Sequence, residues 1–158
     1  MNHESFNKGR DALRAKDYKA AERAFNEAME SMDEHHVLYN QVASYLGLAQ
    51  VLISDRNGLL LCRDAASSET VDGDVFLNLA CAEWHTENRK RAIDAVIRGS
   101  EIDTAHDQLV RACMLLDSRR RNIIPFLPRQ HFMNRFLGRM MRRAQGEISV
   151  HSLLYSQP

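Results

Sequence analysis

Residues 6–28 read FNKGRDALRAKDYKAAERAFNEA, and this stretch decides the fold class. In its first half, Gly9 is a small residue within a helical pattern, so a partner helix can approach closely there. In its second half, small and large residues recur at helical spacing on one face: Ala21, Phe25 and Ala28. Asp17 lies between the halves, where its carboxylate can accept a backbone N–H and cap the second helix. The stretch therefore predicts two helices joined by a tight turn.

The small positions of this stretch recur twice farther along the chain, at intervals of 38 and 33 residues. Three sets of equivalent positions share these intervals: Gly9, Gly47 and Ala80; Ala28, Ala66 and Gly99; and Asp17, Asp55 and Asn88. A period of about 34 residues, built from helix–turn–helix units, indicates a helical repeat array. One such hairpin cannot bury its apolar side alone, so we expect neighbouring units to stack.

The second unit departs from the other two. Leu59 and Arg63 stand where the first unit has Ala21 and Phe25. The 38-residue interval is also about one helical turn longer than the usual period, and we expect the surplus to lengthen the helices around residues 32–39. Both flanking units keep register with this stretch, so we interpret it as a repeat.

A further helix is expected after the third unit, over residues 105–117. Thr104 followed by Asp107 resembles a capping box. The buried stripe of this helix is formed by Leu109, Ala112, Cys113 and Leu116. A terminal helix of this kind would cover the end of the array. The whole pattern, with only 3 prolines and 7 glycines in 158 residues, predicts an all-α protein.

The first unit closely resembles the tetratricopeptide repeat, whose defining small and aromatic positions are here Gly9, Ala21, Phe25 and Ala28. The resemblance covers about residues 4–117 and is to a small bacterial-type member of the family. It implies a right-handed α-solenoid of about three helix–turn–helix units with a C-terminal capping helix, in which the first helix of each unit lines a concave groove. It also implies a non-catalytic scaffold or adaptor that binds a protein or peptide in that groove.

Mapped onto this chain, the resemblance gives a groove lined by the first helix of each unit: Phe6, Asn7, Arg10, Leu13, Arg14, Tyr45, Leu48, Leu77, Asn78, Cys81 and Trp84. Asn78 stands where family members often bind the main chain of a ligand, since an amide both donates and accepts; the alternative is an asparagine exposed to water. Trp84 belongs to a residue type enriched in binding hot spots, but packing is the favoured interpretation. Arg10 and Arg14 are the groove's only cations, which argues against the two-carboxylate clamp of chaperone adaptors.

The composition changes at residue 118. Residues 1–117 hold 13 basic and 20 acidic residues, whereas residues 118–158 hold 8 arginines and one acidic residue. Residues 118–145 are interpreted as a proline-containing strap followed by a basic amphipathic helix. Its arginines flank an apolar side: Arg135, Arg139, Arg142 and Arg143. Residues 146–158 have no clear period and are expected to form a flexible tail.

Three roles of this arginine-rich segment stay open. Its apolar side can dock on the acidic body, or it can bind a partner protein or a second copy of the chain through residues 123–141. Arginine clusters of this density also suit anionic membranes or nucleic acid, which are less favoured because the rest of the chain is acidic. A peripheral protein tethered by this segment is thus the alternative to a groove-binding scaffold.

The sequence contains no HExxH motif, glycine-rich phosphate loop or GxSxG elbow. Cys62, Cys81 and Cys113 are widely separated and odd in number, which indicates buried thiols in a reducing compartment. The adjacent His35 and His36 do not share a helix face and are interpreted as a polar helix start rather than a metal pair. With no secretory signal and no apolar run of membrane-spanning length, we expect a cytoplasmic, non-enzymatic protein without cofactor or metal.

Overall fold

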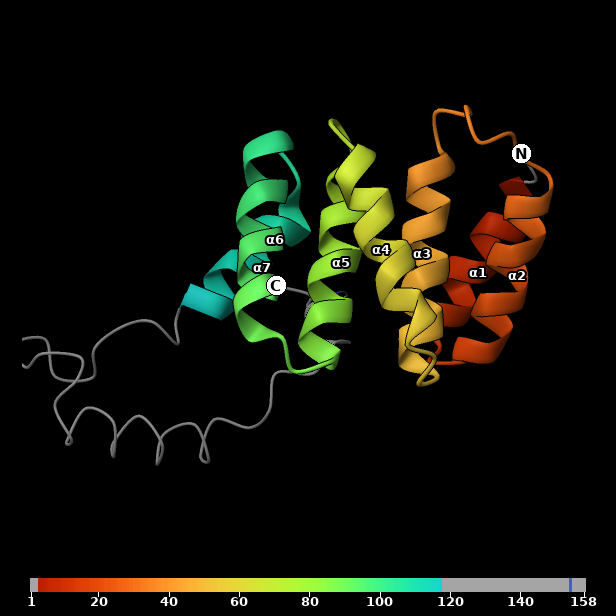
Figure 1. Cartoon of the computed structure of the whole chain (residues 1–158), viewed down its shortest axis with the longest axis horizontal. Coiled ribbons are helices and arrows are strands. Elements are labelled where there is room, and N and C mark those ends of the chain that lie inside the picture. The colour runs from red at the N-terminus through yellow and green to blue at the C-terminus, as the bar shows by residue number, and fades with distance from the viewer. Residues whose placement is uncertain (1–2, 118–153, 155–158) are drawn as a thin grey trace, which may run out of the picture.

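The computed structural model describes residues 3–117 and residue 154. Seven α-helices follow one another along the chain: α1 (His3–Arg14), α2 (Tyr18–Glu30), α3 (Tyr39–Leu52), α4 (Asn57–Ser68), α5 (Gly73–His85), α6 (Arg89–Ile102) and α7 (Asp107–Asp117). The described residues contain no strand, so the predicted all-α class is confirmed for them. The three pairs α1–α2, α3–α4 and α5–α6 follow one another in chain order along the longest axis of the molecule (Figure 1).

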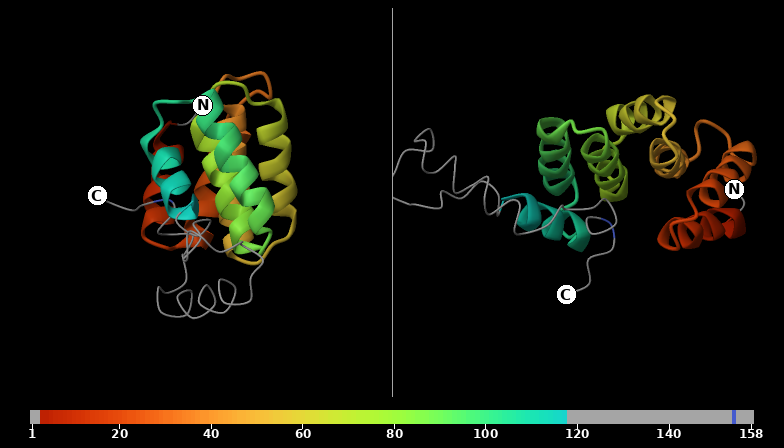
Figure 2. Two further views of the ribbon diagram at one scale, coloured as in Figure 1. Left: turned by 90° about the vertical axis from the view of Figure 1, so that its left-hand side faces the viewer. Right: turned by 90° about the horizontal axis from the view of Figure 1, so that it is seen from below.

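Each helix packs mainly against its neighbours in the sequence. The three most extensive pairs are α1 with α2, α3 with α4, and α5 with α6, and α7 packs on α6. Contacts from α2 to α3 and from α4 to α5 join consecutive hairpins. The odd-numbered helices also touch one another, α1 with α3, α3 with α5 and α5 with α7 (Figure 2). These four helices are called the odd-helix layer below.

The turns inside the three hairpins share one backbone geometry. In each hairpin, a residue with left-handed φ lies two residues after the end of the first helix. These residues are Lys16 at 64°, Ser54 at 72° and Glu87 at 63°. These residues lie at the same intervals of 38 and 33 residues as the small positions. In the first turn, the Asp17 N–H donates to the Ala12 carbonyl at 2.9 Å, and equivalent bonds close the other two turns. This is the Schellman arrangement, which satisfies the last carbonyls of a helix.

Small residues lie where the two helices of a hairpin cross. A Cβ added to Gly9 would meet the ring of Phe25 at 2.5 Å, and one added to Gly47 would meet the carbonyl oxygen of Gly58 at 2.6 Å. Real Cβ atoms essentially never come within 3.0 Å of such neighbours. The close approach that the sequence predicts at Gly9 and Gly47 is therefore confirmed.

The second helix of a hairpin begins differently in different units. Asp17 is the N-cap of α2, as expected, and its carboxylate accepts the N–H of Ala20 at 3.0 Å. Asn88 stands at the N-cap of α6, but its side chain donates to the hydroxyl of Thr86 at 3.1 Å and makes no capping bond. Position alone therefore predicted the start of both helices, but of these two residues Asp17 makes the capping bond and Asn88 does not.

The helix expected over residues 105–117 is present as α7. It begins at Asp107, and its N-terminus is capped by His106, whose Nδ1 accepts the N–H of Leu109 at 3.3 Å. The sequence pattern predicted a capping-box start at Thr104 instead. Leu109 is fully buried, as expected for the stripe that covers the third unit.

The surplus residues of the longer interval form a loop and do not lengthen the helices. Residues 31–38 connect α2 to α3, so the expected helix extension around residues 32–39 is wrong. The Asp33 carboxylate and the His36 ring each accept the backbone N–H two residues farther along, at 3.0 and 3.1 Å. Such local bonds give the backbone an alternative to helical bonding. His35 and His36 therefore lie in a loop and not at a helix start.

Helices α3 and α5 form the centre of the core. Every residue of α3 from 42 to 49 is buried, a run of more than two helical turns, and nine of the 13 residues of α5 are buried. Leu154 belongs to the same hydrophobic cluster and is only 5% exposed. Residues 146–158 are expected to form a flexible tail; apart from Leu154, that range and residues 118–145 lie outside the described part.

Gly47→Ala tests the helix crossing in the second hairpin. The added methyl group meets a backbone oxygen of α4, which cannot turn aside, so we expect the free energy of unfolding to fall by about 1–3 kcal/mol. Urea unfolding followed by circular dichroism measures the change. Asn57→Ala, at an exposed position beside Gly58, is the control and should change stability by about 0.5 kcal/mol or less. Equal loss in both variants would contradict the proposed contact.

Candidate functional site

The groove residues that the sequence predicts all come from α1, α3 and α5, which lie next to one another in the odd-helix layer. Seven of them are buried: Phe6, Leu13, Tyr45, Leu48, Leu77, Asn78 and Cys81. Trp84 is partly buried, and three residues on α1 are exposed: Asn7, Arg10 and Arg14. The basic-arm residues lie outside the described part: Arg135, Arg139, Arg142 and Arg143. The layer thus brings the predicted lining together, with most of it in the core.

An exposed cation lies over two rings at one end of this layer. The rings of Phe6 and Tyr45 meet edge to face, with centroids 5.6 Å apart, and Phe25 packs against both. The Arg10 guanidinium lies 5.9 Å from the centroid of each of the first two rings. An arginine held over aromatic faces keeps its donors free for a ligand while its position is restricted.

The carboxylate of Asp74 joins three helices of the layer. Its Oδ2 accepts a hydrogen bond from the Tyr45 hydroxyl at 3.0 Å and another from the Gln41 amide at 3.2 Å. Its Oδ1 pairs with Nε2 of His106 at 2.9 Å. The carboxylate therefore links α3 and the start of α7 to α5, on which it lies.

Burial and hydrogen bonding act in opposite directions on this ion pair. Burial alone would raise the pKa of Asp74, but the bonds from His106 and Tyr45 outweigh it and hold the pKa below its ordinary value. The bond to Asp74 raises the pKa of His106, and the nearby carboxylates of Asp103 and Asp72 act in the same direction. Both pKa shifts favour the charged pair, whereas the capping bond from the Leu109 N–H requires the neutral ring with its proton on Nε2. Protonation of His106 therefore strengthens its bond to Asp74 and breaks the cap of α7.

Asp74 and His106 were not predicted as site residues from the sequence. A lone carboxylate near a helix start is most often solvated, and a histidine between helices has no periodic partner. One signal was present, because Asp74 follows Gln41 by the repeat interval of 33 residues. The two side chains therefore occupy equivalent positions in adjacent units, where a direct bond between them is geometrically natural.

Asn78 is buried rather than open to solvent, with 1% of its surface exposed. Its side-chain N–H donates to the hydroxyl of Ser44 at 3.0 Å, and that hydroxyl donates to the carbonyl of Gln41 at 2.7 Å. The other amide atom, Oδ1, is buried without a hydrogen-bond partner. An unpaired buried acceptor costs about 1–3 kcal/mol, so Asn78 keeps an unused acceptor inside the layer.

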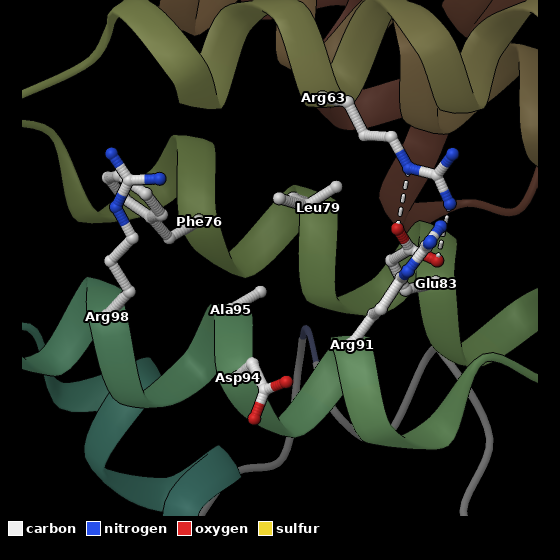
Figure 3. Close-up of a pocket in the computed structure, with 8 residues that line it drawn as sticks. All are labelled: Arg63, Phe76, Leu79, Glu83, Arg91, Asp94, Ala95 and Arg98. Carbon is white, nitrogen blue, oxygen red and sulfur yellow. Dashed lines mark hydrogen bonds and ion pairs between the residues drawn. The ribbon is translucent and has the colours of Figure 1, made fainter.

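A charged cavity of about 450 Å³ lies between α4, α5 and α6. Figure 3 shows Arg63 reaching from α4 to Glu83 on α5, with bonds of 2.7 and 3.1 Å to the two carboxylate oxygens. Arg98 of α6 lies over the Phe76 ring at 5.1 Å. Glu83 is almost completely buried, so this bidentate pair explains why an arginine stands where the first unit has the aromatic Phe25.

The two buried cysteine thiols, of Cys62 and Cys81, are poor nucleophiles in this fold. Burial raises the pKa of Cys62 and of Cys81 far above neutral pH, so both thiols stay protonated. Among the residues that the structure describes, no group of three or more His, Cys, Asp or Glu side chains is arranged to hold a metal ion. The helices in the same part of the chain are too short or too polar to cross a membrane.

No protein-family model, curated protein or solved structure matches the chain. A functional assignment therefore depends on the residues and contacts described above.

The ion pair of His106 and Asp74 predicts a stability maximum in mildly acidic solution. The raised His106 pKa stabilises the fold below the ordinary value of 6.5, and this contribution is lost as pH rises through the folded-state pKa. The lowered Asp74 pKa stabilises the fold above the ordinary value of 3.8, and this contribution is lost as pH falls through the folded-state pKa. We expect Tm to fall between about pH 6 and about pH 8, and His106→Gln to remove much of that fall.

Thermal unfolding across this pH range measures the effect. His85→Gln is the matched control, because His85 is exposed at the end of α5. A His106→Gln profile parallel to that of the wild type and of this control would contradict the assigned role of the pair.

The buried carboxylate of Glu83 predicts a large effect of removing its partner. Arg63→Met leaves this charge unpaired, so the free energy of unfolding should fall by about 2–3 kcal/mol; the partial exposure of Arg63 moderates the loss. Adding Glu83→Leu should restore stability to within about 1 kcal/mol of the wild type. Arg91→Met, at an exposed position of the same cavity, should stay within about 0.5 kcal/mol. No recovery in the double variant would contradict this explanation.

Proposed function

We propose that the chain is a non-catalytic scaffold of the tetratricopeptide type, which binds a segment of another protein on α1, α3 and α5. Its units are the three helical hairpins, arranged as a right-handed α-solenoid, and α7 is the cap. Equal turn geometry in the three hairpins and small residues at the helix crossings support this assignment. Because a fold alone does not decide function, the binding role depends on the odd-helix layer itself.

The observation that carries the proposal is the gathering of apolar and polar side chains from distant parts of the sequence on this one layer. Phe6 from α1, Tyr45 from α3 and Leu77 from α5 belong to one hydrophobic cluster. Arg10 and the bonded Asp74 carboxylate add charge at its edge. Binding faces for peptides combine apolar anchors with a few well-placed polar groups in this way.

The polar groups of the layer differ in what they offer a ligand. Asp74 already accepts three hydrogen bonds, so its role is to position Tyr45 and α7. Arg10 is exposed and offers N–H donors, and Asn78 Oδ1 offers an acceptor. This set suits a peptide whose apolar side chains contact the layer while its backbone N–H and C=O groups bind Asn78 and Arg10.

A photoreactive benzophenone side chain placed at Asn7 tests which face binds. Asn7 is exposed on α1, and Asn26 is an equally exposed asparagine on α2 of the same hairpin. In native lysate we expect intermolecular adducts from the probe at Asn7 and few or none from the probe at Asn26. Gel analysis after irradiation measures the yields. Equal yields at both positions, or adducts at Asn26 alone, would place the binding surface elsewhere and contradict the proposal.

A further inference from the structure

The charged cavity between α4, α5 and α6 has two polar ends and an apolar middle. At one end, the Arg98 guanidinium lies 5.1 Å from the centroid of the Phe76 ring; at the other, Arg91 extends from α6 toward α5 (Figure 3). Leu79 and Ala95 lie between the two ends (Figure 3). The volume of about 450 Å³ falls in the range of about 300–1,000 Å³ that is typical of ligand-binding clefts.

The two arginines of α6 are available to a ligand. Both Arg91 and Arg98 are exposed, and neither forms a salt bridge with another of the described residues. A guanidinium that lies over an aromatic ring keeps its N–H groups at its own edge, where they can donate to an anion in the guanidinium plane. Arg98 is therefore held in position by Phe76 without losing its donors.

The acidic residues of the lining do little to repel an anion. Glu83 is neutralised by Arg63, whose Nε and one Nη atom bond to its two carboxylate oxygens at 2.7 and 3.1 Å. Asp94 is exposed, and Figure 3 shows its side chain directed away from α5. Three arginines against two carboxylates leave the lining with an excess of positive charge.

This positive charge contrasts with the acidic body of the protein. Residues 1–117 hold 13 basic and 20 acidic residues, whereas the sequence of α6, RKRAIDAVIRGSEI, holds four basic and two acidic ones. Three of the basic residues fill positions 89–91 in the first turn of α6, at the positive end of the helix dipole, where cations destabilise a helix. The stability of α6 therefore does not explain its basic character, whereas binding of an anionic partner does.

The spacing of the two arginines indicates the form of the ligand. Arg91 and Arg98 are seven residues apart, close to two helical turns, so they lie on one side of α6 with Cα atoms about 10 Å apart. An extended peptide covers this distance in about three residues. Two acidic side chains at that separation can each pair with one arginine, while an apolar side chain between them contacts Leu79 and Ala95.

We propose that this cavity binds an extended acidic segment of a partner protein, with two carboxylates about three residues apart and an apolar side chain between them. The site is separate from the face on α1, α3 and α5. Phe76 lines the cavity, whereas Asn78 lies two residues later, about 200° around α5. The chain then has two binding surfaces on different sides of α5, and the second goes beyond the proposed function.

A fluorescein-labelled peptide of sequence GSELAEGS, measured by fluorescence anisotropy with the full-length chain, tests the site. We expect it to bind the wild type, and Arg91→Met or Arg98→Met to weaken binding about three- to fivefold, because each removes one exposed ion pair. The double variant should weaken binding about 10- to 25-fold, since independent effects multiply. Lys90→Met is the matched control. It removes one charge from α6 at an exposed position outside the cavity and should stay within about twofold of the wild type.

Altered probes identify the chemistry that is recognised. A peptide in which glutamine replaces both glutamates should bind at least about tenfold more weakly, and so should the original peptide when NaCl is raised from about 50 mM to about 500 mM. Serine in place of the leucine should weaken binding about three- to tenfold, because the apolar contact is lost. A short oligothymidine should not displace the peptide, since a phosphate at every nucleotide would place a charge against Leu79. Displacement would assign the cavity to nucleic acid and overturn the inference.

Circular dichroism verifies that the variants remain folded; if one arginine variant loses helicity, the other decides the outcome. No binding to the wild type, equal binding of the glutamate and glutamine peptides, or equal affinity of Lys90→Met and the arginine variants overturns the inference. Photo-crosslinking at Asn7 should give the same yield in Arg91→Met as in the wild type. Parallel loss of these adducts and of peptide binding would contradict a second, separate surface.

Discussion

The distance between paired helices is the constraint on which the rest of this structure depends. At Gly47 and Gly58 the backbones of α3 and α4 approach so closely that a methyl group on either side would overlap the opposite chain. A Cβ added to Gly9 would likewise overlap the ring of Phe25, and one added to Gly99 would overlap the side chains of Phe76 and Leu109. Because interiors pack as densely as crystals, these contacts fix how far apart the two helices of each hairpin stand. The positions of the odd-numbered helices, and so of the proposed binding face, follow from them.

Ion pairs between hairpins stabilise the array at points where apolar packing is interrupted. The second unit has lost the aromatic residue of the first, and Arg63 uses that space to reach Glu83 of the next hairpin. On the other side of α5, Asp74 connects Tyr45 of the preceding hairpin with His106 before α7. Each pair joins residues of different units and satisfies a carboxylate that would otherwise be costly to bury. The array is thus held by contacts between neighbours, with a hydrophobic core continuous through α3 and α5.

The sequence predicts those features that arise within one helix or one turn. The hairpins around Gly9, Gly47 and Ala80 could be recognised because helical spacing and helix ends are local properties. The loop over residues 31–38 was missed because the Asp33 and His36 side chains compete with the helix for backbone groups, which periodicity does not register. Of the candidate site, the sequence placed the residues on the correct helices. It did not predict their burial, because burial depends on what packs over a helix and not on the helix itself.

The burial of Asn78 has a chemical consequence for the proposed binding role. Its Oδ1 is buried without a hydrogen-bond partner among the residues that the structure describes. A peptide that supplies a backbone N–H at this point gains a hydrogen bond that Oδ1 of Asn78 does not make in the structure. Leaving such an acceptor unpaired costs about 1–3 kcal/mol, which corresponds to roughly a 5- to 150-fold difference in affinity. The same amide that bonds to Ser44 therefore favours a ligand that presents a backbone N–H at this point.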